Sequence, residues 1–137
     1  MVRARRPLIS LLAIAWMVVA GSLAGPFASP PLAADGFVAG IDDLPLMPGL
    51  TSMPESSVAF DSPAGRIVEA YAAGTATRAA ISEFYRRTLP QLGWQPAGTN
   101  AFRREGEQLK LDFPDRPPPG AGAGRGRVVV RFFLSPG

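Results

Sequence analysis

The chain has 137 residues, of which 18% are charged, and its formal net charge is +3. Three of its 14 basic residues lie within the first six positions, so the rest of the chain carries 11 bases against 11 acids and is formally neutral. A neutral chain lacks the basic surface that nucleic acid recognition requires, and this excludes a nucleic acid partner.

Residues 1–34 have the pattern of a signal peptide. Basic residues at the start are followed by an apolar run, Leu8–Ala20, and then by small residues that end at Ala34. This order is typical of secretory leaders. We expect a periplasmic or secreted protein after cleavage. The alternative is an uncleaved anchor in the inner membrane, because residues 8–25 carry no charge and approach the length of a membrane span.

Residues 35–57 form a Pro-rich arm that we expect to be extended. Its three prolines disfavour a continuous helix. The centre of the arm is nevertheless apolar, through Leu44, Leu46, Met47 and Leu50. Apolar segments of this kind dock into grooves or along sheet edges of partner proteins, so these four residues are candidate partner-docking residues. The alternative is that the arm straps its own domain.

A small folded domain is predicted over residues 58–137. Its first strand comprises residues 58–60, and a dense turn signal at 61–65 separates it from a second strand at 66–73.

One amphipathic helix follows. Its apolar residues recur with a period of 3.6 and form one stripe. The stripe consists of Ile81, Phe84, Tyr85, Thr88, Leu89 and Leu92. Thr75 or Thr77 can cap the start of the helix. Pro90 should distort its last turn, and Gly93 is placed for a left-handed stop.

Three further strands are predicted after the helix. Residues 101–104 and 107–113 form a hairpin across a tight turn, residues 114–126 form a flexible Pro/Gly loop, and residues 127–134 form the last strand. The domain is therefore expected to be α+β, with one amphipathic helix packed on a four- to five-stranded antiparallel sheet in the order β-β-α-β-β-β, preceded by the extended arm.

The last strand carries apolar side chains on both faces, because Val129 and Phe133 lie opposite the main apolar face. One helix covers only one face of a sheet. We expect the second face to be covered by the arm or, failing that, by a second copy or another protein.

The segments Val58–Gly74 and Phe84–Trp94, with DLPLMPGL ahead of them and a short FR-EGE-LKL hairpin behind, resemble a group of small exported alphaproteobacterial proteins without an established activity. The resemblance covers most of the chain after the leader. It implies the same arm and compact α+β domain, and it supplies no catalytic, metal or cofactor residues.

The sequence contains no signature of catalysis. Histidine and cysteine are absent, which removes the commonest general base, the Ser-His and Cys-His nucleophile arrangements and most zinc sites. We therefore expect no enzyme activity, no cofactor and no metal. Four arginines are candidates for contact with an anionic membrane or another anion, the alternative being that nearby acids neutralise them. They are Arg103, Arg104, Arg127 and Arg131.

The most plausible function from sequence is a non-enzymatic interaction or accessory module of the cell envelope. It would bind a protein partner or associate with itself. The alternative is a peripheral binder of anionic membrane or of a small ligand through an arginine-rich face.

Overall fold

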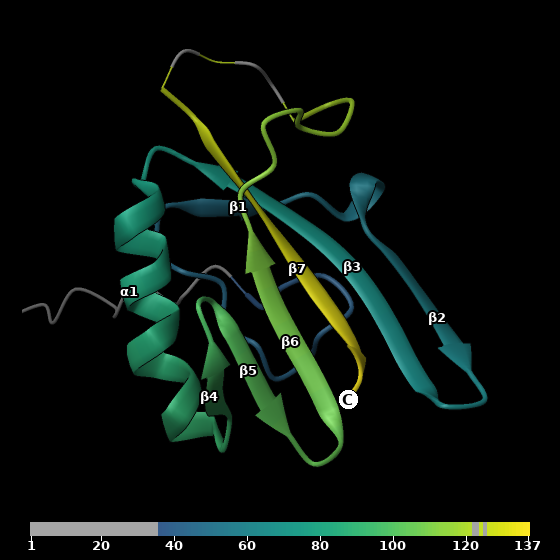
Figure 1. Ribbon diagram of the computed structural model, residues 1–137. Helices are drawn as coiled ribbons and strands as arrows, with labels where there is room; N and C mark the ends of the chain where they lie inside the picture. The colour runs from purple at the N-terminus through teal and green to yellow at the C-terminus, as the bar shows by residue number, and fades with distance from the viewer. Residues whose placement is uncertain (1–35, 122–123, 125) are drawn as a thin grey trace, which may run out of the picture.

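The computed structural model describes residues 36–121, 124 and 126–137, so the predicted leader lies outside the described residues. The described chain is an α+β unit with one α-helix, α1 (Arg78–Thr88), on an antiparallel sheet (Figure 1). This confirms the predicted fold class. The strands are β1 (Leu50–Ser52), β2 (Val58–Ser62), β3 (Gly65–Gly74), β4 (Gln95–Gly98), β5 (Ala101–Arg104), β6 (Glu107–Asp112) and β7 (Val128–Pro136).

The sheet has seven strands, more than the four to five expected. The two additional ones are short: β1 lies within the Pro-rich arm, and β4 contains Pro96. Both escape a search for alternating apolar residues, because β1 has only three residues and β4 contains Pro96 and ends at Gly98. Five of the strands follow the order β3-β7-β6-β5-β4, and both β1 and β2 pair with the remaining side of β3.

The ends of the helix follow from local chemistry. The Thr77 side chain accepts a hydrogen bond from the Ala80 N–H and caps the first turn. The chain then tightens into a 3₁₀ turn, Leu89–Leu92, which contains Pro90, and stops at Gly93 in the left-handed conformation with φ 85°. These features confirm the predicted distortion and stop. Within the described residues no helix combines the length and the apolar character that a membrane crossing needs.

The hairpin between β5 and β6 also has the predicted tight turn. Glu105 and Gly106 both have positive φ, 48° and 82°, as a two-residue turn that matches the strand twist requires. The described residues between β6 and β7 form neither helix nor strand.

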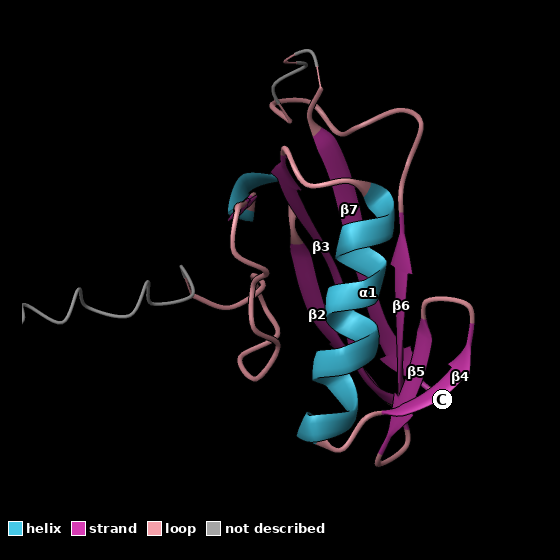
Figure 2. Cartoon of the chain, turned by 90° about the vertical axis from the view of Figure 1, so that its left-hand side faces the viewer, coloured by secondary structure: helices cyan, strands magenta, loops and turns pink. Residues whose placement is uncertain are grey.

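The hydrophobic core lies on one face of the sheet, beneath both the helix and the arm. Arm residues such as Ile41 and Leu44, helix residues such as Ile81 and Tyr85, and sheet residues such as Phe132 belong to one buried cluster. Figure 2 shows α1 in front of the sheet, with the loops of the arm beside it. The prediction that the arm covers the second face is therefore wrong.

The reason is that α1, with only 11 residues, is too short to cover its own face of the sheet. The side chain of Tyr85 joins the two covering segments. Its hydroxyl donates a hydrogen bond to the Pro45 carbonyl at 3.0 Å and accepts one from the Met47 N–H at 3.2 Å. The arm and the helix therefore bury one face of the sheet together.

Candidate functional site

The second face of the sheet is the candidate functional surface, and we call it the open face. In the described part of the chain no helix or arm segment belongs to a buried cluster on this side. Figure 1 looks onto this face, with the arm behind the sheet. Its central side chains come from β3, β7 and β6. They are Ile67, Glu69, Tyr71, Gln108, Lys110, Asp112, Val129, Arg131, Phe133 and Ser135, none of them fully buried.

The open face is apolar toward the β2 edge. Val58 and Phe60 of β2 are 59% and 54% exposed, which is unusual for side chains of their size. Strand register places Phe60 opposite Ile67 and Val58 opposite Glu69, and Glu69 in turn lies opposite Phe133. These neighbours lie on one face because paired residues of antiparallel strands point the same way. Val58, Phe60, Ile67 and Phe133 form an apolar area at one end of the open face, and Glu69 interrupts it between Val58 and Phe133.

The centre of the open face is charged but internally neutralised. Arg131 donates a hydrogen bond to the Asp112 carboxylate at 2.8 Å and lies 3.8 Å from the Glu69 carboxylate. The Asp112 hydrogen bond, aided by the charges of Asp112 and Glu69, raises the pKa of Arg131. Tyr71 donates its hydroxyl proton to Glu69, and partial burial together with that bond raises the pKa of Tyr71. Each of these four side chains is paired with at least one of the others, although the buried Arg131 Nε has no hydrogen-bond partner among the described residues.

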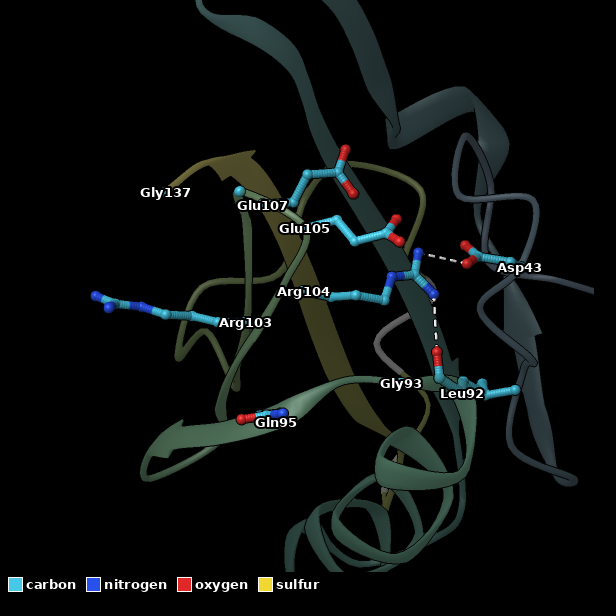
Figure 3. A pocket seen from close by; sticks show the side chains of 10 residues that line it. Asp43, Leu92, Gly93, Gln95, Arg103, Arg104, Glu105, Glu107 and Gly137 are labelled. Atoms are coloured by element: carbon cyan, nitrogen blue, oxygen red, sulfur yellow. Dashed lines mark hydrogen bonds and ion pairs between the residues drawn. The ribbon is translucent and has the colours of Figure 1, made fainter.

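A second feature is a shallow hollow of about 780 Å³ around Arg104, at the end of α1 (Figure 3). The Arg104 guanidinium pairs with Asp43 of the arm at 2.5 Å and donates to the Leu92 carbonyl at 3.1 Å. It also stacks over the Trp94 ring, 4.4 Å from the ring centroid. The Arg104 guanidinium is therefore already in contact with a carboxylate, a backbone carbonyl and an aromatic ring. These contacts tie the arm to the end of the 3₁₀ turn that follows α1.

The rim of the hollow carries acids as well as bases. Glu105 and Glu107 flank it from the β5–β6 turn. Over the described residues no three metal-ligating side chains gather into a group that could hold a metal ion. This mixed, shallow hollow has no arrangement that points to one ligand.

Three of the four candidate docking residues of the arm are buried, and the fourth, Met47, is partly buried. Leu44, Leu46 and Leu50 are 0%, 1% and 3% exposed, and Met47 packs against the same cluster. The docking interpretation is therefore wrong for these residues. They are buried because the arm completes the covering of the core face, which corresponds to the alternative of an internal strap.

The four candidate arginines do not form one basic patch. Arg103 and Arg104 are consecutive on a strand, so they point to opposite faces, and Figure 3 shows them diverging. Arg104 and Arg131 are paired with acids, and Arg127 donates to the Ala73 carbonyl at 3.2 Å. Arg103 and Arg127 are both exposed, but they come from different parts of the fold: Arg103 lies on β5 opposite Gln95 and Gln108, and Arg127 directly precedes β7. The arginine-rich face predicted for an anionic membrane is therefore not assembled.

Sequence reasoning missed the exposed β2 strand. It recognised residues 58–60 as a strand but gave no weight to which side chains would be left uncovered. The available signal was the alternation of Val58 and Phe60 in a strand that directly follows the polar residues 55–57. Exposure depends on what packs above the strand, and the local pattern does not contain that information.

Comparison of the chain with protein families, with curated proteins and with solved structures gives no match. The function must therefore be argued from the geometry of the open face and its edges.

Proposed function

We propose that this chain is an exported, non-enzymatic interaction module of the bacterial cell envelope, which binds another polypeptide through the open face of its sheet. The observation that carries the proposal is the exposure of Val58 and Phe60, at 59% and 54%, beside further half-buried apolar side chains. Exposed apolar areas that border polar groups are typical of protein interaction sites. The internally paired charges of Arg131, Asp112 and Glu69 would give this surface a defined polar border.

The non-enzymatic part of the proposal rests on composition and on pairing. The whole chain lacks histidine and cysteine. The charged groups at the centre of the open face are committed to one another, so they offer no free acid or base to a substrate. Binding through a surface needs no such group. The export part rests on the leader-like segment 1–34.

Site-specific photocrosslinking in intact cells tests the proposal. A benzoylphenylalanine replaces Phe60 in one strain and Phe37 in a control strain. Phe37 is a matched control because it has the same side chain, is 58% exposed and pairs with Pro45 within the arm, which packs on the core face. We expect a discrete crosslinked product from position 60 and none from position 37.

Equal crosslinking from both positions, or none from position 60, would contradict the use of the open face. Fractionation of the same cells, with N-terminal sequencing of the protein, tests export separately. The expected result is a periplasmic or secreted product that starts at Asp35. A cytoplasmic product that retains residues 1–34 would overturn the envelope assignment without bearing on the open face.

A further inference from the structure

The two outer edges of the sheet differ in how they are protected. At one edge, β4 contains Pro96, and its pairing with β5 shifts register between Pro96 and Gly98, as in a β-bulge. Prolines and bulges are devices that prevent an edge strand from pairing with another chain. At the other edge, β2 pairs with β3 without a register shift and contains neither proline nor lysine. The β2 edge, at the outside of the sheet in Figure 1, thus lacks proline, lysine and a bulge, and Asp61 is its one charged side chain.

The backbone of β2 also points outward at defined positions. Tyr71 of β3 directs both its N–H and its carbonyl toward the β1 and β2 side, because the carbonyl accepts from Met53 and the N–H donates to Ser57. Backbone groups alternate sides along a strand, so Glu69 and Ile67 point to the same side and bond β2.

Their partners in register are Val58 and Phe60. Backbone groups alternate in direction along a strand, so Ala59, which lies between Val58 and Phe60, and Asp61, which follows Phe60, direct their N–H and carbonyl groups away from the sheet. Both residues are exposed, and no other described strand pairs with β2. The edge therefore offers two free backbone donors and two free acceptors in a row that is extended and already aligned.

We infer that β2 pairs antiparallel with β2 of a second copy of this chain, on a two-fold axis at Phe60. This deepens the proposed function by naming a partner for the region around the open face. In this register the outward groups of Ala59 bond those of Asp61 in the other copy, and the reverse. Phe60 lies opposite its own counterpart, and Val58 lies opposite Ser62. The two sheets become one, with their open faces on the same side.

The side chains of β2 are complementary to themselves in this register. Asp61 is the only charged residue of the strand, and it faces Ala59, so no like charges lie directly opposite one another. The two Phe60 rings meet in a non-hydrogen-bonded pair, the closer of the two kinds of antiparallel pair. An aromatic pair at this position would shield two side chains that are each 54% exposed in the single copy.

A proline substitution tests the backbone pairing. Ala59→Pro removes an outward N–H and leaves the bonds between β2 and β3 intact, since edge strands tolerate proline on the solvent side. Ala59→Ser is the matched control, because it changes the same site and retains the N–H.

The full-length gene product, purified in the form that the cell makes, is measured by sedimentation equilibrium over a range of concentrations. We expect a monomer–dimer equilibrium for the wild type and for Ala59→Ser. Ala59→Pro should raise the dissociation constant by about tenfold or more, because two symmetry-related hydrogen bonds are lost. A wild type that stays monomeric throughout, or an Ala59→Pro variant that dimerises as well as the control, would overturn the inference.

A cysteine variant tests the register and does not depend on how well the proline variant folds. The chain has no cysteine, so Phe60→Cys introduces a single thiol per copy. Mild oxidation with diamide should give a covalent dimer from Phe60→Cys and none from the matched control Phe37→Cys. Equal yields from both variants, or none from Phe60→Cys, would refute the pairing at the two-fold axis.

The two proposals fail in different ways. A photocrosslinked product at position 60 with the mass of a different protein, together with a monomeric wild type, would retain the interaction module and remove the second copy. A product with twice the mass of this chain, together with the disulfide dimer, would support both.

Discussion

The link between the helix and the arm depends on one hydroxyl group, that of Tyr85. The side chain is fully buried, at 0% exposure, and burial raises the pKa of its hydroxyl. The hydroxyl bonds the Pro45 carbonyl at 3.0 Å and the Met47 N–H at 3.2 Å. Tyr85→Phe keeps the ring and its edge-on contact with Phe132, whose centroid lies 5.2 Å away, and deletes both bonds.

The magnitude follows from the two backbone groups that lose their partner. A buried polar group without a hydrogen bond costs about 1–3 kcal/mol. Both groups are only partly buried, so the low end applies to each, and the expected loss is about 2–3 kcal/mol. For a domain of this size, 1 kcal/mol shifts Tm by about 4–8 °C, so Tm should fall by roughly 10–20 °C.

The assay is thermal and urea denaturation of Tyr85→Phe beside Tyr71→Phe. These are the only tyrosines in the chain, and Tyr71 lies half-exposed on the open face with its hydroxyl on Glu69. Removing the Tyr71 hydroxyl should lower the free energy of unfolding by less than about 1 kcal/mol, because water can donate a hydrogen bond to the Glu69 carboxylate in place of the hydroxyl. Amide exchange at Met47 should accelerate in Tyr85→Phe alone. Equal stability of the two variants, with Met47 still protected, would refute the structural role of this hydroxyl.

Three further results are expected. Burial raises the pKa of the Tyr85 hydroxyl above 10.0, so this group loses its proton at lower pH in the unfolded state than in the folded state. The free energy of unfolding should therefore decrease above pH 10. The urea midpoint, measured between pH 8 and 11, should decrease less steeply for Tyr85→Phe than for the wild type. Gly74→Ala should destabilise the domain by about 1–3 kcal/mol or more, since an added Cβ would lie 2.1 Å from the Gly49 carbonyl oxygen. A melting temperature equal to that of the wild type would contradict this, because it would mean that β1 shifts to make room without a cost in stability. Arg104→Ala should lower the free energy of unfolding by about 1–2 kcal/mol and Asp43→Asn by less than about 1 kcal/mol, because only Arg104→Ala also removes the stacking on Trp94. Equal losses of stability in urea denaturation would contradict this prediction.

Local pattern was sufficient for the elements with a strong period or a clear stop. The stripe that includes Ile81, Tyr85 and Leu89 predicted the helix, and all three are buried. Pro90 and Gly93 predicted how it ends. Alternation predicted β6, where Leu109 and Leu111 are buried. These features depend on neighbours a few residues away, so the sequence contains what is needed.

Local pattern was insufficient for the candidate site. The apolar residues of the arm had two interpretations, and the choice between them depended on whether α1 covers the whole core face. The arginines were expected together because the hairpin and the last strand could be neighbours. Consecutive strand residues diverge, however, and Arg131 lies between Asp112 and Glu69. Neither result is encoded by spacing along the chain.

The sequence by itself determined the fold class and the positions of the helix and of five of the seven strands, because these follow from periodicity, turn residues and caps. Tertiary structure alone decided that the arm and α1 cover the same face and that β2 lies at an edge without proline, lysine or bulge. It also decided that, within the described part of the chain, no helix or arm segment covers the other face. Pairing order and coverage arise from contacts between distant residues, and they determine which backbone and apolar groups a partner can reach.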